Sequence, residues 1–225
     1  MPRQARKQAE SGMYHTMLRG IDRQLIFEDA EDYFRFLDIV QECRELCGFK
    51  LYAYCLMGNH AHLLIKVCHN NLEEIFKRIA GKYVYWYNVK YKRVGHLFQD
   101  RFKSEPVEDD SYFLTVLRYI HQNPVKAKLC AKVGDYPYSS YSEYLANSKW
   151  VDSDFALKML PPEEFIRYNN ADNSDTCLEI CTTENRAVTD SQAKEIIKKI
   201  SRCSTVVEFQ TLEEKKKNPF SSKDP

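Results

Sequence analysis

Two histidines one residue apart begin the second half of an apolar segment near the middle of the chain. Residues 51–67 form two apolar runs separated by Gly58-Asn59, and His60 and His62 begin the second run. Gly-Asn between such runs is typical of a tight β-hairpin, because both residues tolerate positive φ. Side chains alternate along a strand, so the two imidazoles share one face and the intervening apolar residues the other, core face. Imidazole is the commonest protein ligand for metals, so the pair indicates a candidate metal site; two half-buried histidines bonded to neighbours are the alternative.

A helix expected further along the chain offers partners for these histidines. It begins at Asp109-Asp110-Ser111, and Asn123-Pro124 is expected to end it, because the residue before a proline disfavours the α region. Tyr119 and Asn123 are four residues apart and therefore share a face of this helix. The Asn123 amide oxygen is an acceptable third ligand for a divalent ion, and the Tyr119 phenol, one turn away, could attack an anion such as a phosphate held there.

Each member of this constellation also has an ordinary interpretation. The chain contains 15 tyrosines, most of which must be core or surface aromatics. An Asn-Pro pair commonly ends a helix without any chemistry. The rival phenols in neighbouring segments are Tyr83, Tyr87, Tyr91 and Tyr112.

Basic residues are concentrated in one part of a chain whose formal net charge is only +1. Between residues 77 and 103, Asp100 stands alone against many lysines and arginines, which indicates a local surface for a polyanion. Tyr87 and Phe98 could stack on unpaired bases, although a solvated helix face and a core Phe are the alternative. The residues expected to contact DNA are Arg19, Arg23, Lys82, Lys90, Arg93, His96, Gln99, Arg101 and Lys103.

The elements that must position these residues alternate along the chain. A strand at 14–19 ends at Gly20, a helix runs from an Asp29 cap to a Gly48 cap, and the hairpin 50–57 and 60–67 follows. A second helix capped by Asn71, a strand ending near Val107 and the Tyr119 helix complete the set. This order predicts an α+β fold, with a small antiparallel sheet and helices on one of its faces. We expect a domain at 1–150 and a helical C-terminal extension at 151–225, with a linker at 172–175, an amphipathic helix at 190–203 and an unstructured tail.

Composition narrows the cellular setting. The chain has 225 residues, 44% hydrophobic and 29% charged, which is ordinary for a globular protein with a sizeable core. It has no apolar run after its basic N-terminus and none near the roughly 20 residues that span a bilayer, so a cytoplasmic protein without a membrane is expected. The eight cysteines are then expected to be reduced, and their spacing lacks the Cys-x-x-Cys pattern of zinc sites.

Four segments resemble one family in the same order along residues 10–145. These are Tyr14–Gln24, Met57–Leu64, Gly95–Ser104 and Tyr119–Lys126, which look like segments of REP-associated tyrosine transposases, relatives of the single-tyrosine insertion-sequence transposases among HUH nucleases. The resemblance implies a ferredoxin-like palm in which His60, His62 and Asn123 bind Mg²⁺ or Mn²⁺ and Tyr119 is the nucleophile. It further implies nicking of single-stranded or hairpin DNA through a 5′-phosphotyrosine, with a free 3′-OH that can rejoin DNA.

Several alternatives stay open at this stage. The chain could be a domesticated, non-catalytic regulator that binds DNA hairpins, or a metallohydrolase that would need further carboxylate ligands. For the latter, Glu73, Glu74, Glu105 and Glu108 look like ordinary helix or loop acids. The resemblance also implies a longer helical DNA-binding region at the C-terminus, which this chain either lacks by truncation or does not need. The base for Tyr119 is not identified, and both a monomer and a homodimer fit.

Overall fold

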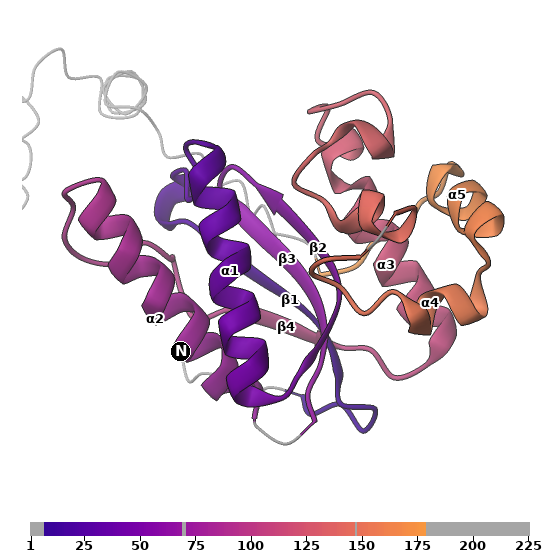
Figure 1. Ribbon diagram of the computed structural model, residues 1–225, viewed down its shortest axis with the longest axis horizontal. Coiled ribbons are helices and arrows are strands. Elements are labelled where there is room, and N and C mark those ends of the chain that lie inside the picture. The colour runs from indigo at the N-terminus through magenta and orange to yellow at the C-terminus, as the bar shows by residue number, and fades with distance from the viewer. Residues whose placement is uncertain (1–6, 69–70, 147, 179–225) are drawn as a thin grey trace, which may run out of the picture. The chain divides into compact units, whose positions relative to one another are not determined.

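The computed structural model describes residues 7–68, 71–146 and 148–178. By compactness the chain divides into Met1–Glu179 and Ile180–Pro225, and the second unit, with the helix expected at 190–203, lies outside the described residues. A four-stranded antiparallel sheet has the strand order β2-β3-β1-β4 (Figure 1). Its strands are β1 (Met13–Arg19), β2 (Lys50–Met57), β3 (His60–Lys66) and β4 (Lys103–Pro106). The helices are α1 (Ala30–Cys47), α2 (Leu72–Lys90), α3 (Asp110–Lys126), α4 (Asp154–Met159) and α5 (Pro162–Asn170), with 3₁₀ turns η1 (Ile21–Arg23), η2 (Val133–Asp135) and η3 (Ser140–Tyr144). The predicted α+β class is confirmed.

The expected helix ends are also confirmed. Asp29 forms a capping box with Asp32 at the start of α1, and Gly48 ends that helix in the left-handed conformation with φ 67°. The side chains of Asn71 and Asp109 accept hydrogen bonds from backbone N–H groups in the first turns of α2 and α3. Such caps satisfy otherwise unpaired donors, which is why short polar residues mark helix starts so reliably.

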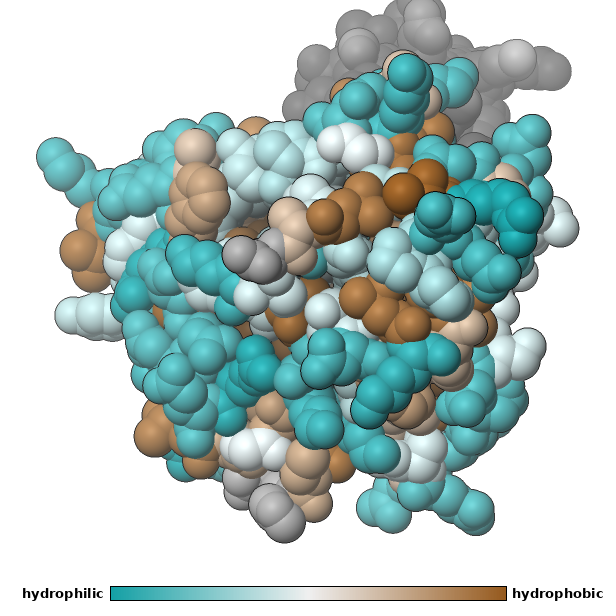
Figure 2. All heavy atoms as spheres, turned by 45° about the vertical axis from the view of Figure 1, so that its right-hand side comes forward, coloured by the Kyte–Doolittle hydropathy of each residue, from teal (hydrophilic) through white to brown (hydrophobic). Residues whose placement is uncertain are grey.

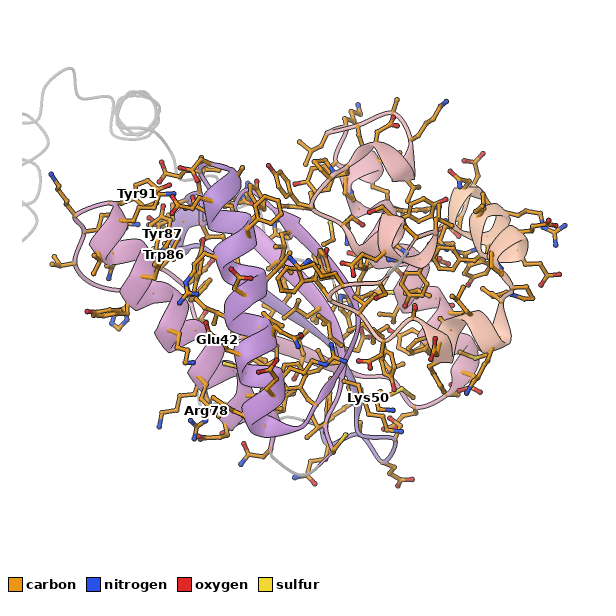
Figure 3. All side chains as sticks on the ribbon, in the orientation of Figure 1. Glu42, Lys50, Arg78, Trp86, Tyr87 and Tyr91 are labelled. Atoms are coloured by element: carbon orange, nitrogen blue, oxygen red, sulfur yellow. The ribbon has the colours of Figure 1, made fainter. Side chains whose placement is uncertain are left out.

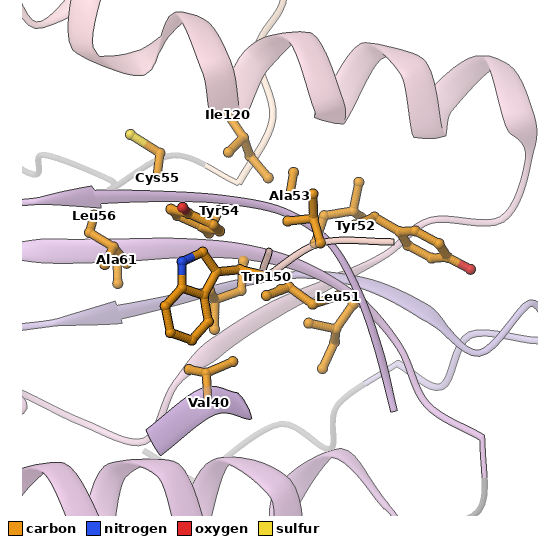
Figure 4. Close-up of a cluster of buried hydrophobic side chains, with 14 of the residues drawn as sticks. Val40, Leu51, Tyr52, Ala53, Tyr54, Cys55, Leu56, Ala61, Ile120 and Trp150 are labelled. Atoms are coloured by element: carbon orange, nitrogen blue, oxygen red, sulfur yellow. The ribbon is translucent and has the colours of Figure 1, made fainter. Parts of the chain in front are cut away.

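Helices cover both faces of the sheet, so the prediction of helices on one face was wrong. α1 and α2 lie on one side and α3 on the other (Figure 1). In the core, Val40 of α1 and Ile120 of α3 approach the strands from opposite sides (Figure 4). The physical reason is visible in β2, whose residues Leu51–Met57 are all buried. A strand buried on both faces reads as a continuous apolar run without alternation.

Helix α3 does not end at Asn123-Pro124 as predicted but continues to Lys126. Pro124 has no N–H to offer Ile120, yet the turn beyond it is closed by hydrogen bonds from Ala127 N to Asn123 O (2.9 Å) and from Leu129 N to Pro124 O (2.8 Å). Pro124 is itself buried, so packing offsets the lost bond. Tyr119 and Asn123 therefore stay in helical phase.

The Gly58-Asn59 hairpin turn is confirmed, but not for the expected reason. Neither residue is among those with positive φ. Instead the turn docks on the segment after β1: Gly58 O accepts from Ile26 N (2.7 Å) and Phe27 N (3.0 Å), and Asn59 O from Gly20 N (2.9 Å). A Cβ on Gly58 would lie 3.0 Å from a methyl of the exposed Leu25 side chain.

Candidate active site

The strand register brings the two histidines to one end of the sheet, on the face covered by α3. In the β1–β3 pair, Arg19 lies opposite His60 and Met17 opposite His62. The centroids of the His60 and His62 rings are 5.2 Å apart, and the Tyr119 ring lies 6.0 Å from that of His62. The structure thus places the predicted nucleophile beside the predicted metal-binding histidines.

Both imidazoles are suited to act as neutral ligands. Burial lowers the pKa of His60 to about 4, and burial together with the neighbouring His15 holds the pKa of His62 well below its usual value. His60 Nδ1 lies 2.6 Å from Asn59 Oδ1, so its Nε2 is left for a ligand. Neutral imidazole with a free lone pair is the form that binds metal.

Asn123 completes the candidate ligand set. Its Nδ2 atom is buried and has no hydrogen-bond partner among the residues described, so the amide sits at an unsatisfied polar position. A half-turn of the amide would present its carbonyl oxygen there instead. Within residues 7–68, 71–146 and 148–178 no three His, Cys, Asp or Glu side chains cluster to hold a metal ion, so the third protein ligand would be this amide. Two imidazoles and an amide oxygen fit a divalent cation.

His15 and Glu105 were missed as site residues. His15 is fully buried, its Nε2 lies 2.9 Å from His62 Nδ1, and its ring meets that of Tyr119 edge-on at 5.7 Å. Glu105 lies opposite His15 in the β1–β4 register, with Oε2 at 3.8 Å from His15 Nδ1. The alternation of strand side chains puts His15, Met17 and Arg19 on one face. This signal could have identified His15 only if β1 had been known to lie between β3 and β4.

Lys126 is a third residue that sequence reasoning did not single out. Its Nζ lies 5.1 Å from the centroid of the Tyr119 ring, two turns along the same helix. Lys126 also donates to Asp175 O (3.0 Å), and Arg118 forms an ion pair with the Asp175 carboxylate at 2.7 Å. The segment predicted as a linker at 172–175 thus contacts α3 next to Tyr119.

Arg19 and Arg23 form a positive edge beside His60. Desolvation and the neighbouring Arg23 lower the pKa of Arg19, whose buried Nε has no hydrogen-bond partner among the described residues. Arg23 has φ 63° and follows Asp22 at φ 48°, a conformation costly for side chains other than glycine. An Asn59 Nδ2 contact to Arg23 O at 3.4 Å ties this strained turn to the hairpin that carries His60.

The other expected DNA-binding residues divide between two places. Lys103 lies opposite Met17 and therefore on the same face as His62. Lys82 and Lys90 belong to the layer on the opposite face, where Lys82 pairs with Glu42 at 2.8 Å and Lys90 with Asp29, Glu31 and Asp32 at 2.8–2.9 Å. Figure 3 shows Glu42 on α1, and Trp86, Tyr87 and Tyr91 toward the end of α2. The structure does not bring Lys82 and Lys90 to Tyr119.

A cavity of about 720 Å³ is lined by most of the remaining residues that were predicted to contact DNA. It lies between α2 and the loop before β4, with Phe76, Phe98 and Phe102 among its apolar walls. The loop is anchored to the end of β1, since Gln99 N donates to Arg19 O at 2.9 Å. The polar residues predicted to contact DNA that line this cavity are His96, Gln99 and Arg101. Arg93 lies outside it, bonded to Gln24 at 2.9 Å and over the Tyr87 ring.

The side of the molecule that carries α3 to α5 is polar overall. Figure 2 turns this side toward the viewer and shows apolar side chains in small groups among hydrophilic ones. None of the helices described between residues 7 and 178 is long and apolar enough to cross a membrane.

An antiparallel sheet with paired histidines on one strand, facing a tyrosine on a packed helix, defines the class of single-tyrosine HUH transposases to which the four segments are similar. Residues 8–123 match the family model described as "Transposase IS200 like". The chain belongs to this family.

One relative by sequence and one solved structure of the same fold are consistent with that assignment. A REP-associated tyrosine transposase of Haemophilus influenzae is 32% identical over 105 residues, which are 41% of this chain. This chain covers 59% of the length of that relative. A solved structure of a REP-associated tyrosine transposase bound to a REP hairpin shares the fold, with a TM-score of 0.58 and 15% identity over 80% of this chain and 96% of that one. The predicted resemblance to REP-associated tyrosine transposases is confirmed.

Proposed function

We propose that this protein nicks and rejoins single-stranded DNA next to a hairpin, with Tyr119 as the nucleophile and Mg²⁺ or Mn²⁺ as cofactor. The observation that carries the proposal is the position of Tyr119 beside the half-buried His60 and the buried His62, with the unpartnered Nδ2 of Asn123 one turn along the same helix. The hairpin is proposed because the structurally similar transposase is bound to one.

In the proposed reaction Tyr119 exchanges one ester for another. The Tyr119 phenol gives up its proton to solvent as its oxygen bonds to the scissile phosphorus, the P–O3′ bond breaks, and the departing 3′ oxygen takes up a proton from solvent. The 5′-phosphotyrosine keeps the energy of the phosphodiester, so the 3′-OH of a second strand can reverse the step without ATP. The Lys126 ammonium lies 5.1 Å from the Tyr119 ring centroid, so a positive charge stands beside the reacting phenol and phosphate.

His60, His62 and Asn123 would hold the metal ion. When bound, it supplies Lewis-acid polarisation of the phosphate and a template for its orientation. Because none of the three ligands is anionic, the site stays attractive to a phosphodiester. Arg19, which lies opposite His60 in the sheet, is placed to receive the neighbouring phosphate.

The surface for the remaining DNA follows from the positions of the basic residues. Arg23 and Lys103 flank the histidine face, and the cavity beside α2 combines the Phe98 ring with Gln99 and Arg101 at its rim. Unpaired bases stack on aromatic rings while cations contact the backbone, so this cavity fits a base of the single strand flanking the hairpin.

One observation favours the alternative of a non-catalytic hairpin-binding regulator. Tyr119 is only 6% exposed, and residues 173–175 contact the same helix beside it. A regulator would use the basic surface without exposing the phenol.

The covalent adduct separates the two functions. Full-length protein is incubated with hairpin oligonucleotides carrying single-stranded flanks and Mn²⁺ or Mg²⁺, and the products are resolved under denaturing conditions. We expect a protein–DNA adduct that Tyr119→Phe abolishes and that Tyr85→Phe, a change in an exposed phenol on α2, leaves in place. Tight hairpin binding without any adduct would support the regulator, and an adduct that survives Tyr119→Phe would refute the nucleophile.

A further inference from the structure

Glu105, His15 and His62 form a line of three side chains from the edge strand into the histidine site. Each comes from a different strand, β4, β1 and β3, and the register places Glu105 opposite His15. His15 Nε2 lies 2.9 Å from His62 Nδ1, while His15 Nδ1 faces Glu105 Oε2 at 3.8 Å. His15 Nδ1 and Glu105 Oε2 are both buried and have no hydrogen-bond partner among the residues described, so each is the polar group that the other faces.

The donors and acceptors along this line determine its direction. The contact with His15 lowers the pKa of Glu105, so this carboxylate is ionised near neutral pH and can only accept. His15 is fully buried and lies against a second imidazole, an environment that favours the neutral ring with a single N–H. That proton is favoured on Nδ1, facing the carboxylate, because the other tautomer would set a lone pair against a negative charge. His15 Nε2 is then an acceptor.

We propose that Glu105 and His15 fix the tautomer of His62, with the proton on Nδ1 and the lone pair of Nε2 directed to the metal ion. His15 and Glu105 are thus positioning residues for a ligand, and the inference rests on the metal-dependent function proposed above. A partner that fixes the tautomer and ring orientation of a metal-binding histidine commonly matters almost as much as the ligand. Glu105, which looked like an ordinary acid in the sequence, would be the carboxylate that orients His62 through His15.

The same accounting argues against His15 as the base for Tyr119. Its Nε2 is occupied by His62 and its Nδ1 faces the Glu105 carboxylate at 3.8 Å, although the His15 and Tyr119 rings are only 5.7 Å apart. His15 therefore contacts the phenol ring as a packing partner.

The tautomer can be measured directly in the full-length protein without metal or DNA. The chain has only 6 histidines, so ¹H–¹⁵N correlation spectra of the imidazoles can be assigned by single substitution. We expect His62 protonated on Nδ1 near neutral pH, and an increased share of the Nε2–H form in Glu105→Gln, because a neutral amide can donate as well as accept. His62 protonated on Nε2 in the unaltered protein would overturn the inference.

Metal affinity gives a second readout that does not depend on catalysis. Titration of Mn²⁺ followed by electron paramagnetic resonance should show affinity reduced by roughly 10- to 100-fold in Glu105→Gln and in His15→Phe. Glu108→Gln changes an exposed glutamate three residues away and is the matched control, expected to bind Mn²⁺ like the unaltered protein. Unchanged Mn²⁺ affinity in Glu105→Gln would overturn the inference. Because Glu105 is partly exposed, Glu105→Gln can be tested even if His15→Phe fails to fold.

Failure of this inference is distinguishable from failure of the proposed function. A protein that binds Mn²⁺ through an Nδ1–H His62 yet forms no DNA adduct would uphold the tautomer and refute the nuclease. A protein that forms the adduct with His62 protonated on Nε2 would uphold the nuclease and refute the tautomer.

Discussion

His121 provides a quantitative test of how the Tyr119 helix is held in place. This imidazole is fully buried on α3, with Nδ1 at 2.9 Å from Asn169 Oδ1 of α5 and Nε2 at 2.8 Å from Ser140 Oγ of η3. Burial lowers its pKa to about 4, against 6.5 for an ordinary histidine. With both nitrogens occupied, His121 also has no atom to offer Tyr119.

The sign of the effect follows from proton linkage. As the pH falls below 6.5 the unfolded chain binds a proton at His121 that the folded state resists until about pH 4, so the folded state is progressively destabilised. The shift corresponds to about 3 kcal/mol in full, of which roughly 2 kcal/mol is lost between pH 7 and pH 5. The other buried histidines add to the total, so the contribution of His121 must be isolated with a variant.

The variant is His121→Gln, whose amide can still donate to and accept from Asn169 and Ser140 but does not titrate. Urea unfolding at pH 7 and pH 5 should show a pH dependence of the unfolding free energy that is about 2 kcal/mol smaller in the variant than in the unaltered protein. The lower starting stability of the variant does not affect this difference. An unchanged pH dependence would refute the neutral, doubly bonded His121.

Four further substitutions test other parts of the structure and of the proposed mechanism. Lys90→Met leaves the fully buried Asp32 carboxylate without its cation. The unfolding free energy in urea titrations should fall by roughly 3 kcal/mol. Unaltered stability with weaker hairpin binding would instead support Lys90 as a DNA contact. Gly58→Ala should change the unfolding free energy by less than about 1 kcal/mol, because the nearby Leu25 is exposed and can move, whereas Gly48→Ala at φ 67° should cost about 1 kcal/mol or more. Lys126→Met should slow adduct formation, measured as initial rates near neutral pH, because the reacting phenol and phosphate lose a cation 5.1 Å from the Tyr119 ring centroid; an unchanged rate would contradict that role.

Much of the fold was predictable because local signals agreed with each other. The caps Asp29, Gly48, Asn71 and Asp109 and the two-residue hairpin turn mark their elements through backbone hydrogen bonding, which acts over a few residues. The second layer of helices was missed because burial of both faces of β2 depends on α3, a segment more than 50 residues later.

The site residues also divide into those that local spacing predicts and those that depend on the order of the strands. His60 and His62 share a face because strands alternate, and Tyr119 and Asn123 share a face because helices turn, so both pairs follow from spacing. His15 and Glu105 approach His62 only because β1 lies between β3 and β4, and no local pattern encodes that order. Lys82 and Lys90 were grouped with the DNA contacts from their sequence neighbourhood, but their partners Glu42 and Asp32 come from α1.

The arrangement explains why a carboxylate near the proposed metal need not be its ligand. A carboxylate bound directly to the ion would offset its charge and weaken its attraction for a phosphodiester. Glu105 stands behind His15, at 3.8 Å from its Nδ1, and can orient His62 through one intervening ring. In the proposed site, His15 and Glu105 together supply orientation, while His60, His62 and Asn123 leave the ion cationic. The double variant His15→Phe with Glu105→Gln should then weaken Mn²⁺ binding no more than the stronger single change, because both act on His62 through the same hydrogen bond. Additive losses would show that the two side chains act separately, and the line from β4 to the metal site would have to be abandoned.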